Sequence, residues 1–305
     1  MKKLSKDTLI KLLVVCILFL SVILALITFS NGGLMPTWKE IGTELGLVKQ
    51  ELVSDDFVRF IDVGQGDSIL ISSNGHNAMI DFGDNADNGR DLLLKLDEYN
   101  VDDFDCIFMT HYDSDHIGGA DAVLESLDVD NVIIPKTEGE KSTAYRQVAD
   151  SLDNTDAKVV VAQTGKLITI GDFNIEIVAY YRNEDESNDR SIILLADFDG
   201  TKFLFTGDAG KKIENYLMKE KKNIDCDVFK ASHHGSKYSN SEKFLKYITP
   251  EYTVISCGAN NSYGHPHEEV ITALEKVDSA IYRTDEEGDI TFYLVGNNIV
   301  VETEK

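Results

Sequence analysis

The pattern of hydrophobic and polar positions divides the chain into an apolar N-terminal run and a long series of short elements. Residues 12–29 form an 18-residue run without a charged side chain, which is close to the minimum length of a membrane-spanning helix. From Phe57 onward, short runs rich in Val, Ile and Phe are separated by glycine-containing turns, which is typical of β-strands. Stretches such as RDLLLKLDEYN and EEVITALEKV have the spacing of amphipathic helices instead.

The order of these elements predicts a single α/β domain. A run of strands is followed by strands that alternate with helices, and the scheme then repeats, with a hairpin expected at Asp199-Gly200. This order suits two sheets packed face to face with helices outside them. We therefore divide the chain into an N-terminal anchor (1–33), a juxtamembrane linker (34–56) with one short helix around residues 38–47, and a globular domain (57–305).

The flanks of the apolar run predict its orientation in a membrane. Lys2, Lys3, Lys6 and Lys11 precede it and almost no basic residue follows closely, so the N-terminus should stay in the cytoplasm and the rest should lie outside. The alternative is a signal peptide whose cleavage releases a secreted protein, but no convincing A-x-A site follows the run. An uncleaved single-pass anchor with an extracytoplasmic domain is therefore our prediction.

Charge and cysteine content limit the function further. The chain has 29 Lys and Arg against 53 Asp and Glu, a net charge of −24, which repels nucleic acid and anionic lipid at long range. A polyanionic substrate would need local positive features, although the charge could equally serve only solubility. The four cysteines have no CxxC spacing, so the sequence supports neither a zinc ribbon nor a disulfide framework.

The densest group of chemically active side chains lies in THYDSDHIGG, residues 110–119. It holds His111, Asp113, Asp115 and His116, and imidazole and carboxylate groups that converge are good ligands for zinc or manganese. A purely structural alternative is that Asp115 caps the helix predicted for ADAVLESL. Four such residues within six positions favour a metal site.

Further candidate ligands follow later strands. Asp208 ends FLFTGD and could bridge two metals, at least one of His233 and His234 should be a ligand, and His265 follows YTVISC. Six of the seven histidines fall in these stretches, and His76 is the exception. His267 could equally serve as the start of the next helix. The distribution predicts a site with two metals.

The motifs FIDVGQGDSILI, MIDFGD, THYDSDHIGG, FLFTGDA, SHHGSKYS and YGHPH, in this order, resemble the metallo-β-lactamase fold. With Asp113 in place of the usual second histidine, they are similar to the nuclease domain of the ComEC DNA-uptake channel. The resemblance covers Phe57 to Leu294. It implies an αββα four-layer sandwich, a metallo-β-lactamase-like hydrolase domain at residues 57–305, and two divalent metal ions, zinc or manganese, at the strand-end edge.

The resemblance also implies roles for individual residues. One metal would be held by His111 and Asp113, the other by Asp115 and His116, with Asp208 between them and His234 or His233 joining the second. Asp81 would brace the ligand loop from behind, and Asp67 would be structural. Asn188 and Ser191 take the place of the fold's usual third-motif histidine. The candidate catalytic residues are Asp115, His265 and Lys237, while Gly235 and Ser236 could bind a phosphate through their amides.

Together these features predict a membrane-anchored, metal-dependent phosphodiester hydrolase, most consistent with an extracytoplasmic DNase. The sequence offers Lys230, Lys237 and Arg283 as cations for a substrate groove. Two alternatives stay open: a phosphodiesterase acting on a cell-wall polymer or its phosphorylcholine substituent, and a non-enzymatic anchored module with a vestigial site. A single anchor gives no basis for DNA translocation, and Asp113 argues against β-lactamase activity.

Overall fold

The computed structural model describes residues 54–84, 89–136, 142–180, 187–296 and 298–305. The predicted anchor and the linker helix near residues 38–47 lie outside these residues. Among the helices of the described residues, none has the length and apolar character needed to span a bilayer. The described part begins just before the first predicted strand, and its contacts group residues 54–305 into one compact unit.

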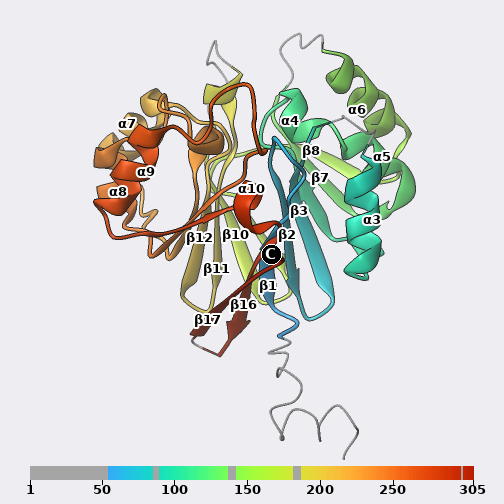
Figure 1. Ribbon diagram of the computed structural model, residues 1–305. Coiled ribbons are helices and arrows are strands. Elements are labelled where there is room, and N and C mark those ends of the chain that lie inside the picture. The colour runs from blue at the N-terminus through green and yellow to red at the C-terminus, as the bar shows by residue number, and fades with distance from the viewer. Residues whose placement is uncertain (1–53, 85–88, 137–141, 181–186, 297) are drawn as a thin grey trace, which may run out of the picture. The chain divides into compact units, whose positions relative to one another are not determined.

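An eight-stranded sheet is formed mainly by the first half of the described chain (Figure 1). It is antiparallel from β17 to β3 and parallel from β3 to β8. Its strands, in spatial order, are β17 (Asn298–Thr303), β16 (Ile290–Val295), β1 (Phe57–Phe60), β2 (Ser68–Ser73), β3 (His76–Phe82), β5 (Cys106–Phe108), β7 (Asn131–Ile134) and β8 (Lys158–Val161).

A seven-stranded sheet packs against the first. Its strands, in spatial order, are β15 (Ala280–Arg283), β14 (Tyr252–Ile255), β13 (Val228–Lys230), β12 (Thr201–Phe205), β11 (Ile193–Phe198), β10 (Phe173–Ala179) and β9 (Leu167–Ile170). The predicted Asp199-Gly200 turn joins β11 to β12. A small parallel pair, β4 (Asp103–Phe104) and β6 (Asp128–Val129), lies apart from both sheets.

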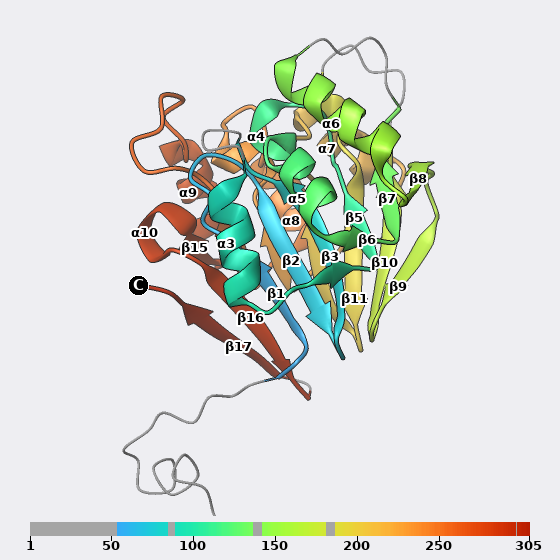
Figure 2. The ribbon, with the colours of Figure 1, turned by 90° about the vertical axis from the view of Figure 1, so that its right-hand side faces the viewer.

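Helices cover the outer faces of both sheets (Figures 1 and 2). The first sheet is covered by α3 (Arg90–Glu98), α5 (Ala120–Ser126) and α6 (Thr143–Asn154), and the second by α7 (Lys211–Lys219), α8 (Glu242–Ile248) and α9 (Glu268–Glu275). Short helical turns complete the described part: α4 (Ser114–Ile117), α10 (Thr284–Glu287), η1 (Asn188–Arg190) and η2 (Ser232–Gly235). The arrangement is the expected αββα sandwich.

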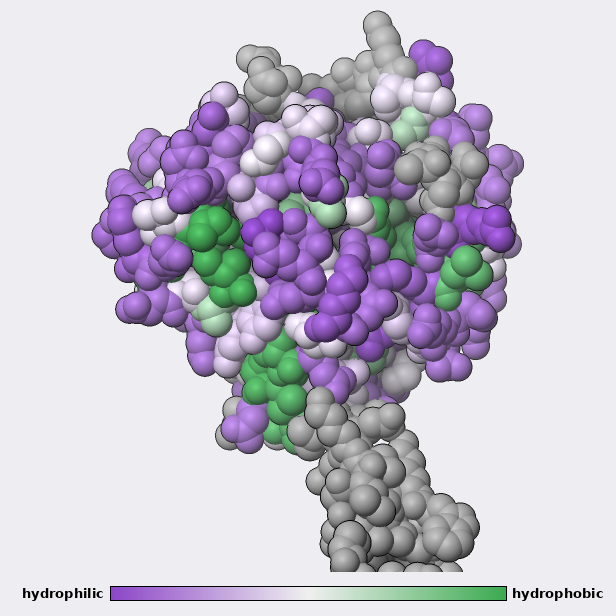
Figure 3. Space-filling model, viewed as in Figure 1, coloured by the Kyte–Doolittle hydropathy of each residue, from purple (hydrophilic) through white to green (hydrophobic). Residues whose placement is uncertain are grey.

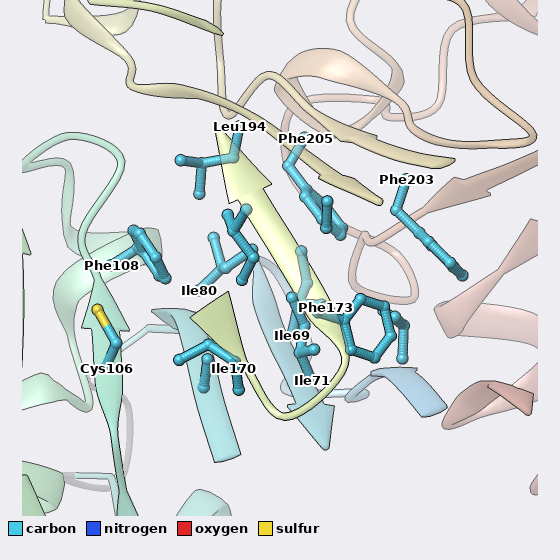
Figure 4. Packing of buried hydrophobic residues seen from close by; sticks show 14 of the residues in the cluster. Ile69, Ile71, Ile80, Cys106, Phe108, Ile170, Phe173, Leu194, Phe203 and Phe205 are labelled. Carbon is cyan, nitrogen blue, oxygen red and sulfur yellow. The ribbon is translucent and has the colours of Figure 1, made fainter. Parts of the chain in front are cut away.

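Alternation along the strands explains why the layers hold together. In β2, Ile69 and Ile71 point into the core between the two sheets, where Figure 4 shows them near Phe173 of β10. Leu70, between them, belongs to the apolar cluster under α3 and α5 instead. Because successive side chains in a strand alternate in direction, a strand that is covered on both faces must be almost continuously apolar.

The parallel portions of the two sheets position the candidate ligands. In the first sheet β3, β5 and β7 run parallel, and in the second β12, β13 and β14 do so. Parallel strands bring their carboxyl-terminal loops to one edge of a sheet. His111 follows β5, Asp208 follows β12, and His233 follows β13, so each predicted ligand leaves its sheet at such an edge.

Candidate metal centre

The loop after β5 is fixed from behind by Asp81. This carboxylate accepts hydrogen bonds from the amide of Thr110 at 2.8 Å and from its hydroxyl at 2.6 Å, and it lies 2.8 Å from Nδ1 of His116. Asp81 is fully buried and has a φ of 56°, a conformation that non-glycine residues adopt at a cost. The bracing role that the resemblance implied for Asp81 matches this geometry.

Asp115 is placed for the metal site and not for helix capping. The residue that precedes α5 at its cap position is Gly119, while Asp115 lies within α4 with Oδ2 3.2 Å from Nε2 of His234. The adjacent GQGD turn needs its glycine here, because a Cβ on Gly66 would lie 2.2 Å from the carbonyl oxygen of Asp115. The amide of Asp67 donates to that same carbonyl at 3.1 Å, which ties the turn to the ligand loop.

Asp208 stands between four imidazole rings, and its two oxygens face different pairs. Oδ1 lies 3.2 Å from Nε2 of His116 and 3.6 Å from Nε2 of His234. Oδ2 lies 3.9 Å from Nε2 of His111 and 3.7 Å from Nε2 of His233. A carboxylate placed in this way could bridge two metal ions, and that role of Asp208 stays a prediction.

The two consecutive histidines reach opposite oxygens because of an unusual turn. Both His233 and His234 have a φ of 52°, and Gly235 follows with a φ of 78°. Such backbone conformations cost about 1–3 kcal/mol each and persist where the surrounding structure enforces them, often at functional sites. Here the amide of His233 donates to Gly207 and the amide of Ser236 donates back to His233. Both histidines, not only one, therefore face Asp208.

The donor atoms form two groups that share Asp208. The first half-site comprises His111 Nε2, Asp113 Oδ2, His233 Nε2 and Asp208 Oδ2; the second half-site comprises Asp115 Oδ2, His116 Nε2, His234 Nε2 and Asp208 Oδ1. In the first, the sequence prediction had placed Asn188 and Ser191 where His233 now stands.

The donor atoms of both half-sites suit divalent metal ions. The separations between neighbouring donors run from 3.2 to 3.9 Å, and tetrahedral ligands with bonds of about 2.1 Å lie about 3.4 Å apart. The tightest group, with donor atoms all within 4.8 Å of one another, is on the side of the second half-site and comprises Asp67, His116, Asp208 and His234. Nε2 of His111, His116 and His234 and Oδ1 of Asp208 are buried without a hydrogen-bond partner. Orphaned buried polar atoms cost roughly 1–3 kcal/mol each and call for an explanation, which a shared metal ligand role provides.

Solvent reaches these groups from one side. The side chains of His116, His234 and His111 are 0–2 % exposed, whereas that of Asp113 is 42 % exposed and that of His233 28 %. The buried rings thus form a floor and the more exposed ligands form a rim. A substrate would approach from the rim, where α4 lies at the upper end of the sheets (Figures 1 and 2).

Lys230 and Asp67 form a buried ion pair behind the second half-site. Nζ of Lys230 lies 2.7 Å from Oδ1 of Asp67, which in turn lies 3.2 Å from Nδ1 of His234. Asp67 has a donor atom within 4.8 Å of those of His116, Asp208 and His234, yet it faces the far nitrogen of His234. The same nitrogen donates to the carbonyl of Ser256 at 2.9 Å, so Ser256 and Asp67 together orient that ring. The expectation that Lys230 lines a substrate groove is wrong because the residue is only 1 % exposed.

The carboxylates and imidazoles of the cluster shift each other's pKa values. Burial disfavours protonation of His234, but the carboxylates of Asp208, Asp67 and Asp115 outweigh it and raise the pKa of His234 to about 9. The pKa of His116 is raised well above its usual value, again against burial, by Asp208 and Asp81. Burial would raise the pKa of Asp115, but the nearby imidazoles of His234 and His116 lower it to about 2. Without metal, protons on the rings offset the carboxylates.

The remaining predicted residues surround this cluster. Ser191 is buried and its hydroxyl accepts from the amide of Asp208 at 3.1 Å, so it supports the bridging residue. Nδ2 of Asn188 lies 3.4 Å from Nδ1 of His233. The Ser236 amide is already bonded to His233, which leaves it unavailable to a phosphate. Gly235 packs so closely on Pro266 that a Cβ would come within 2.7 Å of it.

The loop after β14 adds two more histidines. The His265 ring lies 5.5 Å from that of His233 and 6.1 Å from that of His234, measured between centroids. Burial and the neighbouring histidines lower the pKa of His265 to about 4, so this ring is neutral at pH 7. His267 precedes α9 at its cap position, and its Nδ1 accepts from the amide of Lys237 at 3.4 Å.

Among the three cations proposed for a substrate groove, Lys237 alone is left exposed and without an ion pair in the described residues. Arg283 pairs with Asp285 at 2.7 Å and Glu286 at 2.6 Å. Lys237 is exposed beside the Tyr238 ring. Figure 3 shows a surface dominated by hydrophilic residues, with hydrophobic residues in small separate groups. Sequence reasoning missed Thr110, the Asp67–Lys230 pair and Tyr263, which stacks on His265.

Comparison with known proteins agrees with this geometry. Residues 61–259 match the family model described as the metallo-beta-lactamase superfamily. The chain belongs to the metallo-beta-lactamase superfamily. With this fold and this donor set, it is a metal-dependent hydrolase whose buried Asp and His cluster suits divalent metal ions.

Similar sequences are found among competence proteins. The chain is 29% identical over 260 residues to the ComE operon protein 3 of Bacillus subtilis (strain 168), which covers 79% of this chain and 33% of that protein. It is 30% identical over 234 residues to the competence protein ComA of Neisseria gonorrhoeae, covering 76% and 31% respectively. The chain thus spans about a third of the length of these relatives.

The fold also occurs among solved structures. The metallo-beta-lactamase fold protein YhfI from Bacillus subtilis superposes with a TM-score of 0.53 at 10% sequence identity, covering 78% of this chain and 100% of that one. At this identity the likeness concerns the fold alone. It agrees with the two central sheets and flanking helices described above.

Proposed function

We propose that this protein is a phosphodiesterase that cleaves DNA outside the cytoplasm, held at the membrane by its N-terminal segment. The observation that carries the proposal is the pair of half-sites that share Asp208. Two divalent ions at such a site would activate a water molecule and neutralise charge on the phosphate and leaving oxygens. The similarity to competence proteins supports DNA as the substrate.

The chain's own residues prepare the site for this chemistry. Asp81 holds the far nitrogen of His116, and the carbonyl of Ser256 with Asp67 holds that of His234, so that both rings present Nε2 toward Asp208. Carboxylates that orient ligand histidines in this way are typical supports of metal centres. With five nitrogen or bridging donors and two further carboxylates, we propose zinc or manganese, and the mixed donor set suits either.

The rim residues would contact the substrate. His265, neutral at pH 7, lies beside His233 and could accept or relay a proton near the leaving group. Lys237, which is exposed, is a cation available to the phosphate that adjoins the scissile bond. These two roles are proposals that rest on position.

A second candidate is hydrolysis of a smaller diester, such as a phosphorylcholine substituent of a cell-wall polymer. The burial of Lys230 and the pairing of Arg283 favour it, because they remove two of the three cations that the sequence offered for a substrate groove in a chain with net charge −24. A small, weakly anionic substrate would need fewer positive contacts than a DNA strand.

The test uses the purified full-length protein in mild detergent with manganese or zinc. Plasmid DNA, single-stranded DNA, p-nitrophenyl phosphorylcholine and bis-p-nitrophenyl phosphate are offered in parallel, with Asp208→Asn as the inactive control. Cleavage of DNA that the control loses supports the proposal. Hydrolysis of the choline ester without cleavage of any DNA would favour the second candidate, and inertness toward all four would refute phosphodiesterase activity.

The membrane topology has its own test. Protease added to intact cells should digest residues 57–305 if the lysines before the apolar run keep the N-terminus inside. Full protection in intact cells, with digestion only after lysis, would place the domain in the cytoplasm.

A further inference from the structure

A column of aromatic rings leads from the metal centre to the surface. The ring of His265 lies 5.5 Å from His233 on one side and 5.6 Å from Tyr263 on the other. The Tyr263 and His265 rings are stacked, with planes 19° apart. Tyr263 is 63 % exposed. The ring of Tyr263 therefore lies against His265 and is otherwise largely exposed to solvent at the end of the column.

The loop that carries Tyr263 is held in place by one side chain. Asn261 donates to the carbonyls of Gly258 at 2.9 Å and His265 at 2.6 Å, and it accepts from the amides of Tyr263 at 3.2 Å and His265 at 3.0 Å. The side-chain amide of Asn261 thus makes four hydrogen bonds, two as donor and two as acceptor, which uses both of its N–H groups and both lone pairs of its oxygen. A single exposed aromatic residue is ordinary on a protein surface. Tyr263 differs because its ring stacks on His265, which contacts His233, and because hydrogen bonds to Asn261 fix its loop, so the ring is preorganised for a flat ligand.

We infer that Tyr263 is a base-stacking subsite, which holds an unpaired nucleobase next to the phosphodiester at the metal centre. This inference rests on the proposed function and names the form of its substrate, a single strand. Every base has a flat face, so stacking is tolerant of sequence and needs no positive charge. A chain with net charge −24, in which Lys230 is buried and Arg283 is paired with acidic side chains, gains from a contact that needs no positive charge.

The open geometry favours a base over a quaternary ammonium group. Recognition of such a cation typically uses several aromatic rings that enclose it. Tyr263 offers one face only, because His265 covers the other, and the ring stands largely in solvent. A flat ring on an open platform suits a flat ligand. Bases within a duplex are already stacked, so the subsite requires a strand that is unpaired at this position.

Binding is measured first, independently of cleavage. The full-length protein, kept in EDTA, is titrated into a single-stranded oligonucleotide that carries 2-aminopurine, whose fluorescence falls when it stacks. We expect quenching with the native protein, loss of quenching with Tyr263→Ala, and retention with Tyr263→Phe. Tyr216→Ala, at a tyrosine of α7 that is 42 % exposed, is the matched control and should quench normally. Absence of quenching with the native protein overturns the inference.

Turnover then separates stacking from a structural effect on His265. With metal present, Tyr263→Ala should raise KM for oligothymidylate by roughly 5- to 150-fold, the loss expected from one base stack, and leave kcat within about twofold. An abasic strand of equal length should show no such change. An unchanged KM for oligothymidylate, or an equal rise on the abasic strand, overturns the inference even if native DNA cleavage upholds the proposed function. Conversely, quenching without any cleavage upholds the subsite and refutes the nuclease.

Discussion

Nζ of Lys230 lies 2.7 Å from Oδ1 of Asp67, and both side chains are buried directly behind His234. The two residues are far apart in the sequence, on either side of the sandwich interior, yet they meet beside the ring of a candidate metal ligand, whose Nδ1 also donates to the carbonyl of Ser256 at 2.9 Å. The lysine also bonds the carbonyl of Ala231 at 2.9 Å. Its charge compensates a carboxylate that would otherwise be buried beside Asp208 and Asp115.

The first prediction concerns this pair. Lys230→Met should lower the free energy of unfolding by about 3–5 kcal/mol, because it leaves Asp67 as an uncompensated buried charge. Urea denaturation of the metal-free protein measures the change. The double variant Lys230→Met/Asp67→Asn should recover part of the loss, since neither charge is then left alone. Lys202→Met, which breaks the partly exposed pair with Asp225, should change stability by less than about 1 kcal/mol. Equal losses in the two single variants would contradict this account.

The second prediction concerns the two adjacent histidines. His233→Ala should remove one donor of the first half-site and reduce bound metal toward one ion per chain, because the second half-site keeps all its donors. His234→Ala should instead weaken the second half-site and leave Asp67 without its imidazole partner. Elemental analysis after dialysis against a fixed metal concentration measures both. Full metal content in His233→Ala would show that this ring is not a ligand.

Much of the fold was predictable because the sequence patterns of its strands and of its helices are both clear. Strands covered on both faces read as continuous apolar runs, as Ile69, Leu70 and Ile71 do, and amphipathic helices such as α9 show the helical spacing. The edge strand β17 was not predicted. Its residues are half exposed and include Asn298, Glu302 and Thr303, so it has no clear apolar pattern. The strand is stabilised mainly by pairing with β16 at six positions.

The candidate metal ligands were easier to predict from the sequence than the residues that hold them in place. Histidines and aspartates that cluster after strands are rare enough to be noticed in a sequence, and their loops do converge. Lys230 looked like a surface cation because lysine usually is one, and only its three-dimensional pairing with Asp67 reverses that reading. Both His233 and His234 face Asp208 because both adopt left-handed backbone conformations. Histidine rarely adopts this conformation, so the sequence pattern did not predict it.

The third prediction concerns protons. In the metal-free protein the pKa of His234 is raised to about 9 and that of His116 is raised well above its usual value, so both rings are protonated at pH 7. Their Nε2 atoms must lose those protons to bind metal, and loading should therefore release about two protons per chain at pH 7. Metal affinity should rise as pH is raised toward the pKa of His234, about 9, and fall as pH is lowered. Calorimetry in two buffers of different ionisation enthalpy measures the release.

The control for that experiment lies within the cluster. Asp81→Asn removes one of the carboxylates that raise the pKa of His116, so its loading at pH 7 should release fewer protons than the native protein does. If both proteins release none, the rings are neutral before binding, and the description of the metal-free charges is incorrect.

The last prediction concerns salt. Lys237 is exposed, while Lys230 is buried and Arg283 is paired, so of the three cations proposed for the groove we expect Lys237 to contact single-stranded DNA. Each such contact contributes about −0.7 to the slope of log K against log salt for a single strand, and we expect a total slope of about −1 for one or two contacts. Lys237→Ala should flatten it by about one contact, whereas Lys246→Ala, in the exposed pair with Glu242, should leave it unchanged. Fluorescence titration at several salt concentrations gives the slopes. A value several times steeper would require a basic surface elsewhere in the chain, and base stacking would then be a minor part of recognition.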